Sequence, residues 1–445
     1  MAAALATALG SLSIAVVASP AAVTVAHAFP RGPSVPVTMA PVGLSIEYPL
    51  MAQDLGTGPC PPPALTAELE RLGSPPLSLA GDSQDLTAPA GALGASPASW
   101  ESATLYPLPA SFWSQLHCLL SATRDPLTAG VNLKTGALSW ATQIAAGAAA
   151  AATNGLNFSV GNEPDLYELP DYASLGTRVT TENLAAVNLY LQLVANLQQT
   201  IGEVPLVGPE LANAAHWRRQ LPRVIAQLHM QTVGVHMYPL SACETPRAVT
   251  LGGLLSAYAA DEPDKQGWVV ADARAAGVPA IISEANSASC GGAPGVSDSP
   301  AAAVWAVRFV LSALKTGFAE VRFHFSGGAY DPFVVRGEQV LAQPLEAALV
   351  ALNAWLPVGS SLRTLGGVPG LLATSVSAPR GDPEVIFDNE HPRSETVVLQ
   401  APGPITLEQL SALRPGLLVH TLIPRRGTVK LTVAPSSLVA IASHA

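Results

Sequence analysis

Charged and aromatic residues are scarce in this sequence. Asp, Glu, Lys and Arg together make up 12% of its 445 residues and aromatic residues 5%, whereas hydrophobic residues make up 49%. A chain of this length and apolar content is not disordered over most of its length, and we expect a large core divided between two domains. The 22 Lys and Arg residues are outnumbered by 32 Asp and Glu residues. The resulting net charge of −10 argues against nucleic acid or a sulfated polymer as the main partner.

Cysteine is also scarce, and no C-x-x-C motif occurs among the four cysteines. This pattern argues against a metal or redox site built from cysteines. In addition, no group of His, Asp and Glu residues in the sequence has the spacing of metal ligands. We therefore expect neither a metal nor a cofactor. The four cysteines fit an oxidising compartment. We expect Cys243 to pair with Cys290, because each follows a predicted strand, and Cys60 to pair with Cys118.

Long charge-free hydrophobic runs are absent beyond the N-terminus. Residues 1–28 are small and apolar and end in Ala26-His27-Ala28, which is typical of a secretory signal peptide with an A-x-A cleavage site. No Lys or Arg precedes Arg31, so the basic start of such a signal is missing. A non-cleaved anchor and a mis-set start codon stay open as alternatives. We expect a secreted or extracytoplasmic protein without stable membrane insertion after cleavage.

Short apolar runs that end in polar or turn-forming residues recur along residues 41–345. They are Gly43–Glu47, Leu77–Asp82, Ala129–Leu133, Leu156–Glu163, Pro205–Glu210, Thr232–Tyr238, Ala280–Glu284 and Val321–Phe325. The segments between them carry apolar residues at helical spacing. Strands that alternate with helices in this way predict a (β/α)₈ TIM barrel. An open doubly wound sheet is less favoured, because no Gly-rich phosphate loop follows the first strand.

Residues 346–445 follow a different rhythm of short strand-like runs separated by Gly and Pro. The runs are Leu371–Ser377, Glu384–Phe387, Glu395–Leu399, Gly403–Leu407, Leu417–Leu422, Val429–Val433 and Leu438–Ile441. This pattern predicts a C-terminal antiparallel β-sandwich domain. The N-terminal segment 29–40 can add a strand, Val35–Thr38, to that domain.

Ionisable and amide side chains collect at the ends of the predicted barrel strands. They are Glu47, Asp82, Asn132, Asn162, Glu163, Glu210, His236, Tyr238, Glu284, Asn286 and His324. The carboxyl ends of barrel strands meet at the face where active sites lie. Burying so many polar groups is costly unless they are paired or used, so the pattern indicates a functional site.

Two of these side chains have the arrangement of a glycosidase pair. In LNFSVGNEPD, Glu163 follows a buried run that Pro164 terminates, and in PAIISEANS, Glu284 ends a second run. The two runs are the fourth and seventh predicted strands, which face each other across a barrel mouth. Facing carboxylates can cleave a glycosidic bond, one as general acid and the other as nucleophile.

Four motifs together resemble glycoside hydrolase family 79, the β-glucuronidase and heparanase-like enzymes of clan A. They are GLSIEYP, LAGDSQD, SVGNEPDLY and ISEANS. The resemblance covers nearly the whole chain and implies a retaining mechanism. It implies that Glu163 is the acid/base, that Glu284 is the nucleophile, and that Asn162 contacts the sugar 2-hydroxyl.

The resemblance also implies residues that bind the substrate. Glu47 would bind sugar hydroxyls, and Tyr238 would contact the nucleophile. Backbone amides of the loop after the nucleophile, which contains Ser289 and Gly291, would hold a glucuronate carboxylate together with Tyr330. Asp82 departs from the family, which usually has Asn there, and it adds a negative charge to a site for an anion.

We therefore predict an exported, retaining exo-β-glucuronidase whose substrate is a small glycoside or oligosaccharide with terminal β-linked glucuronic acid. A neutral-sugar β-glycosidase for glucosides or xylosides is the alternative if Asp82 repels a carboxylate, and a non-catalytic carbohydrate-binding protein is another. We expect His236 and His324 to be satisfied histidines of the inner barrel and Glu210 to orient a neighbour. Asp165, like Glu168 and Asp171, is interpreted as a solvated loop charge.

Overall fold

The chain folds into two compact units in the computed structural model. The model describes residues 24–25, 28–92, 105–134, 138–167, 184–202, 204–243, 249–379, 385–401 and 403–443. One unit comprises Val37–Val358, and the other comprises Gly359–Ser411 and Leu417–Ala445 with the N-terminal segment that ends at Pro36. The predicted signal peptide lies largely outside the described residues. No described helix is both long enough and apolar enough to cross a membrane.

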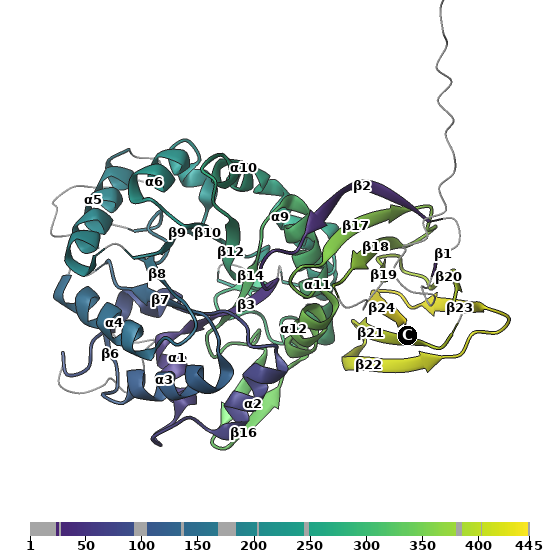
Figure 1. The fold of residues 1–445 in the computed structure, drawn as a ribbon, viewed down its shortest axis with the longest axis horizontal. Coiled ribbons are helices and arrows are strands. Elements are labelled where there is room, and N and C mark those ends of the chain that lie inside the picture. Colours follow the sequence, from purple (N-terminus) through teal and green to yellow (C-terminus); the bar gives the residue numbers. More distant parts are fainter. Residues whose placement is uncertain are drawn as a thin grey trace, which may run out of the picture. The chain divides into compact units, whose positions relative to one another are not determined.

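The unit Val37–Val358 contains a closed barrel of parallel strands, which confirms the predicted TIM barrel (Figure 1). The strands are β3 (Val42–Glu47), β4 (Leu77–Ala80), β7 (Leu127–Val131), β8 (Leu156–Val160), β9 (Leu206–Leu211), β10 (Thr232–Met237), β12 (Ala280–Ala285) and β14 (Val321–Phe325). The barrel closes where β14 pairs with β3, with Val321 opposite Val42. Nearly every residue of these strands is buried, which explains their continuous apolar runs.

Helices surround the barrel strands (Figure 1). They include α1 (Tyr48–Leu55), α2 (Pro63–Arg71), α3 (Phe112–Thr123), α4 (Leu138–Ala151), α5 (Leu184–Ile201), α6 (Leu221–Leu228), α10 (Gly267–Ala275), α11 (Pro300–Thr316) and α12 (Pro344–Trp355). In α6, the residues at helical spacing, Leu221, Val224, Ile225 and Leu228, are all buried. The sequence pattern did not predict α1 or α12. Most of α12 is buried, so it lacks the polar face that marks a surface helix.

The second unit is built from two antiparallel sheets. The larger sheet has the order β2-β17-β18-β19-β24-β21-β22, and the smaller has the order β1-β20-β23. The strands are β1 (Thr24–Val25), β2 (Phe29–Pro36), β17 (Ser361–Gly366), β18 (Leu372–Ser377), β19 (Val385–Asn389), β20 (Glu395–Gln400), β21 (Ile405–Ser411), β22 (Arg414–Leu422), β23 (Thr428–Val433) and β24 (Ser437–Ser443). β2 pairs with β17, with Val35 opposite Leu362.

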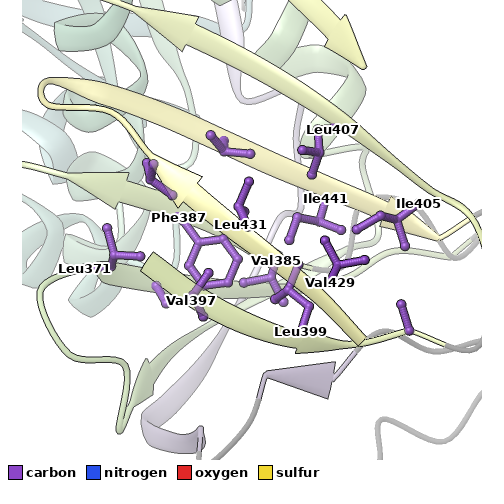
Figure 2. Close-up of a cluster of buried hydrophobic side chains, with 14 residues drawn as sticks. Leu371, Val385, Phe387, Val397, Leu399, Ile405, Leu407, Val429, Leu431 and Ile441 are labelled. Atoms are coloured by element: carbon purple, nitrogen blue, oxygen red, sulfur yellow. The ribbon is translucent and has the colours of Figure 1, made fainter. Parts of the chain in front are cut away.

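A continuous apolar core lies between these two sheets (Figure 2). Phe387 and Ile441 come from the larger sheet, and Leu399 and Leu431 from the smaller. Along β20, buried residues such as Leu399 alternate with exposed ones, as expected for a strand with one face on a core. The predicted antiparallel β-structure after the barrel is therefore confirmed.

Candidate active site

The polar side chains that follow the barrel strands meet at the carboxyl-terminal mouth of the barrel. Glu47 ends β3, Glu284 lies near the end of β12, and Glu163 follows β8. His236 and His324 lie near the ends of β10 and β14. Residues that are widely separated in the sequence therefore share one site, which is the usual location of active sites in this fold.

Glu163 lies in a tight turn directly after β8. Gly161 and Glu163 both have left-handed backbone conformations, with φ of 77° and 49°, which turn the chain away from the strand. The Glu163 N–H donates to the carbonyl of Glu210 on β9, at 3.0 Å. The Glu163 side chain is 23% exposed, and its Oε1 lies 3.0 Å from Nδ1 of His236. This turn holds the carboxyl group at the mouth while leaving it open to solvent.

Glu284 is more enclosed than Glu163, with a side chain that is 7% exposed. The Tyr238 hydroxyl donates to Glu284 Oε1 at 2.7 Å, and Nδ1 of His324 lies 3.4 Å from Oε2. Oε2 itself makes no hydrogen bond with the described residues. Tyr238 therefore holds Oε1 by a hydrogen bond, whereas Oε2 has the His324 ring nearby but makes no hydrogen bond in the part of the chain that the structure describes. Burial, then the charge of Glu284, raises the pKa of the Tyr238 hydroxyl well above its ordinary value, so it stays a donor.

His236 lies close to three carboxyl groups, one on β9, one on β12 and one directly after β8. Its Nδ1 lies 3.0 Å from Glu163 Oε1 and 3.7 Å from Glu284 Oε1, and its Nε2 lies 3.3 Å from Glu210 Oε2. Burial alone would lower the pKa of His236, but Glu284, Glu163 and Glu210 raise it well above its ordinary value. The carboxyl groups of Glu163, Glu210 and Glu284 are therefore the partners that satisfy this buried histidine.

The same three residues have a spacing at which a metal ion could bind. One ligand atom from each of Glu163, His236 and Glu284 lies within 4.8 Å of the others. The raised pKa of His236 favours a protonated ring, an imidazolium, which places a positive charge beside Glu163 and Glu284. A metal ion at the same place would have to displace that proton.

Glu47 lies in a cradle formed by the turn after β4. Its Oε1 accepts a hydrogen bond from the Asp82 N–H at 3.1 Å, and its Oε2 accepts one from the Ser83 N–H at 2.8 Å. Nε2 of His324 lies 3.4 Å from Glu47 Oε1. Gly81 has a φ of 78°, and a Cβ there would lie 2.4 Å from Glu47 Oε1. Only glycine therefore fits this turn, which fixes the orientation of Glu47.

Asp82 and Asn162 lie side by side at the mouth. Nδ2 of Asn162 donates to Asp82 Oδ1 at 3.3 Å. Asp82 keeps access to solvent, but its carboxyl group has lost part of its hydration. This loss, followed by the charges of Glu47, Glu284 and Glu163, raises the pKa of Asp82 to about 6. Asp82 therefore changes charge within the ordinary working range of enzymes.

Asp85 organises the turns behind Asn162, and the sequence pattern did not identify it. The Asn162 N–H donates to Asp85 Oδ2 at 2.9 Å, and the Tyr167 hydroxyl donates to the same oxygen. Asp85 Oδ1 accepts from the N–H groups of Leu133 at 3.0 Å and Lys134 at 3.3 Å. Its place in a 3₁₀ turn after β4 gave no sign of these distant partners. Asp85 holds the loops after β7 and β8 together.

Asp165 is a correction to the sequence prediction, which interpreted it as a solvated loop charge. It is 3% exposed, and its carboxylate accepts from the N–H groups of Ala212 at 2.9 Å and Asn213 at 3.0 Å. Nδ1 of His216 lies 2.9 Å from Asp165 Oδ2. The residue is buried because it ties the turn after β8 to the end of β9. Glu168 and Asp171, interpreted in the same way, lie outside the described residues.

The loop after β12 is cross-linked to the loop after β10. Strand β13 (Ala288–Ser289) pairs with β11 (Leu240–Ser241), and the Ser289 hydroxyl donates to the Ser241 hydroxyl at 3.1 Å. A disulfide joins Cys243 to Cys290, and a second joins Cys60 to Cys118. Both bonds join the pairs expected from the sequence.

The residues after Ser289 form a concave turn that contacts the loop after β14. Cys290, Gly291 and Gly292 have φ values of 56°, 78° and 79°. The Gly291 carbonyl accepts from the Ala329 N–H at 2.7 Å. The neighbouring Tyr330 is 2% exposed, and its hydroxyl shares a 3.0 Å hydrogen bond with Ser326. The Tyr330 ring meets the His324 ring edge to face, with centroids 5.9 Å apart.

The sequence matches no protein-family model and no curated protein. The fold is similar to that of a 4-O-α-L-rhamnosyl-β-D-glucuronidase from Fusarium oxysporum 12S, with 19% identity and a TM-score of 0.74 over 94% of this chain and 99% of that one. It is also similar to a GH51 arabinofuranosidase from Xanthomonas axonopodis pv. citri, with 13% identity and a TM-score of 0.67 over 93% and 98%. A GH30 xylanase from Clostridium acetobutylicum has 12% identity and a TM-score of 0.57, also over 93% and 98%. The chain thus shares its fold, a closed barrel of parallel strands, with these glycoside hydrolases.

Proposed function

We propose that the protein is a retaining glycoside hydrolase that resembles family 79 and removes terminal β-linked glucuronic acid. The observation that carries this proposal is the approach of two glutamates at the barrel mouth. An oxygen of Glu163 and an oxygen of Glu284 lie within 4.8 Å of each other. Retaining enzymes place their carboxyl groups about 5 Å apart, whereas inverting enzymes leave about 6.5–9.5 Å for a water molecule.

The surroundings of the two glutamates support different roles. Glu284 is enclosed and its Oε1 accepts from Tyr238, which supports the role of an oriented nucleophile whose Oε2 makes no hydrogen bond with a described residue. Glu163 is partly exposed, so it can reach both a leaving group and water. In the proposed first step, Glu284 Oε2 attacks the anomeric carbon while Glu163 gives its proton to the departing oxygen. In the second step, Glu163 takes a proton from water, which attacks the anomeric carbon and releases Glu284.

The remaining residues of the mouth would bind the sugar. Asn162, which precedes the proposed acid/base in the sequence, would contact the sugar 2-hydroxyl, as the family resemblance implies. Glu47 would accept from other sugar hydroxyls, since the N–H groups of its cradle fix its orientation. Both assignments depend on the proposed reaction.

Two features of the loops after β12 and β14 support glucuronate as the sugar. Cys290, Gly291 and Gly292 are consecutive residues in left-handed conformations, and successive N–H groups in such turns form concave anion sites. None of their N–H groups donates to the part of the chain that the structure describes. Tyr330 lies beside this turn, where its hydroxyl can add a donor. One of the similar structures is itself named as a glucuronidase.

Asp82 favours the second candidate, a β-glycosidase for neutral sugars. Above its pKa of about 6, this carboxylate would repel a glucuronate. Below that value it is neutral and resembles the Asn that family 79 usually has there. The glucuronidase proposal therefore includes an acidic working range.

We also propose that the protein works outside the cytoplasm. Its two disulfides are of the kind that persists in oxidising compartments. Release of the mature chain into the culture medium, with a new N-terminus near Phe29, would support export. Retention of the full-length chain inside the cell would contradict it.

The proposal is tested by turnover of a chromogenic β-glucuronide beside the matching β-glucoside and β-xyloside. Glu284→Gln should lower kcat on the preferred substrate by at least about 10⁴-fold, because it removes the nucleophile. Glu338→Gln is a matched control, since Glu338 is an exposed residue between β15 (Phe333–Arg336) and β16 (Gln339–Ala342). Normal turnover by Glu284→Gln would exclude the mechanism. Faster turnover of the glucoside would favour the neutral-sugar enzyme, and binding without turnover by the unmodified protein would favour a carbohydrate-binding protein.

A further inference from the structure

A polar cavity lies on the barrel unit, apart from the glutamate pair. It has a volume of about 290 Å³ and is lined by residues of α1, of the loop after β14 and of β15. Asp54 of α1 and Asp331 of the loop contribute carboxyl groups, and Gln53 and Ser326 contribute further oxygen atoms. None of the glutamates at the barrel mouth lines this cavity.

Asp54 is the unusual residue of this cavity. It is only 4% exposed, yet its carboxyl group makes no hydrogen bond with any described residue. Asp331 is 3% exposed, and its Oδ1 accepts from the N–H groups of Ser326 at 3.1 Å and Gly328 at 3.2 Å. No Lys or Arg lines the cavity. Two buried carboxyl groups thus face one space without a cationic side chain.

Packing alone does not explain this arrangement. An ionised carboxylate that is buried without a partner is costly, and a second carboxylate nearby increases the cost. An apolar residue at position 54 would fill a helix face at lower cost, so the carboxyl group indicates a ligand.

We propose that this cavity binds a hard divalent cation such as Ca²⁺, anchored by the carboxylates of Asp54 and Asp331. Oxygen atoms of Ser326 and Gln53, together with water, would complete a coordination shell of about six to eight oxygens. Two carboxylates balance the charge of one divalent ion. The small number of charged ligands indicates a dissociation constant of about 10⁻⁴ M or weaker.

The test is a titration of the full-length protein with CaCl₂, followed by thermal unfolding and by calorimetry. Saturating Ca²⁺ should raise the Tm by about 2–4 °C, and a magnesium salt and a sodium salt at equal ionic strength should have smaller effects. Asp54→Asn should abolish the shift. Glu338→Gln removes one negative charge from the neighbouring hairpin and should keep the shift, since Glu338 does not line the cavity.

The Asp54→Asn variant without added cation gives a second readout. Asp54 and Asp331 are the acidic residues that line the cavity. Asp54→Asn should also raise the Tm of the cation-free protein at about pH 8, because it removes an unpartnered charge.

Three results would overturn the proposal. The first is that Ca²⁺ has no saturable effect on the unmodified protein, and the second is that it has an equal effect on Asp54→Asn. The third is that Asp54→Asn has a lower Tm than the unmodified protein without cation, which would indicate a purely structural role for the carboxyl group. These measurements record binding and stability alone. A failure here would leave the glycosidase proposal unaffected.

Discussion

Asp82→Asn should show how much the charge of Asp82 weakens the binding of a negatively charged substrate, without changing the two glutamates. The substitution removes one negative charge but keeps the size of the side chain and an oxygen that can accept from Asn162. With a pKa of about 6, Asp82 is ionised in more than about nine tenths of molecules at about pH 7.5 and in about one tenth at about pH 5. The variant should therefore behave differently at the two pH values.

The expected magnitude follows from the Coulomb repulsion between the negative charges of Asp82 and the glucuronate. At about 6–8 Å and an effective dielectric constant of about 20, two charges interact by about 2–3 kcal/mol. Asp82 keeps access to solvent, so screening reduces this figure to about 1 kcal/mol, or about fivefold in affinity. Asp82→Asn should thus lower the KM for a β-glucuronide about fivefold at about pH 7.5 and change it little at about pH 5.

The assay compares kcat and KM for a chromogenic β-glucuronide and the matching β-glucoside across this pH range. The neutral glucoside is the control, because changes in the glutamate pair affect both substrates alike. A selective gain for the glucuronide that fades as the pH falls is the expected result. Equal changes for both substrates, or a glucuronide effect that does not depend on pH, would refute the electrostatic reasoning.

Three further predictions follow from the geometry of the site and from the disulfides. His236→Asn should lower kcat by about 10²-fold. It should also move the acid limb of the pH profile to higher pH, because loss of the imidazolium makes the neighbouring carboxylates harder to ionise. An unchanged profile would argue against His236 as their counterion. Gly81→Ala should lower activity more than it lowers the Tm, since the new Cβ meets Glu47, and normal turnover would show that the turn can shift. Replacement of Cys60 and Cys118 by Ser should lower the free energy of unfolding by about 4 kcal/mol for a loop of 58 residues; denaturant unfolding that shows no loss would contradict it.

The barrel could be predicted because its strands are buried on both faces and therefore appear as continuous apolar runs. Glu163 and Glu284 could be identified because each ends such a run. The N-terminal helix α1 and the buried helix α12 were missed, since neither shows a polar face that alternates with an apolar one.

The environment of each site residue could not be predicted in the same way. His236 lies among carboxylates from β8, β9 and β12, and no local pattern in the sequence brings these strands together. Asp165 has the appearance of a loop charge until the turn after β9 folds over it. Asp54 and Asp331 are far apart in the sequence, so no local spacing indicated that they line one cavity.

The position of His236 has a consequence for the timing of the proposed reaction. While the sugar is attached, Glu284 is an ester without charge, and Glu163 has just given up its proton. The imidazolium then lies 3.0 Å from a newly formed carboxylate, whereas before the reaction its main electrostatic partner was Glu284. One fixed cation therefore serves as counterion to the nucleophile in the free enzyme and to the base in the covalent intermediate. The histidine need not move between the two half-reactions, because the negative charge is on Glu284 before the first and on Glu163 after it.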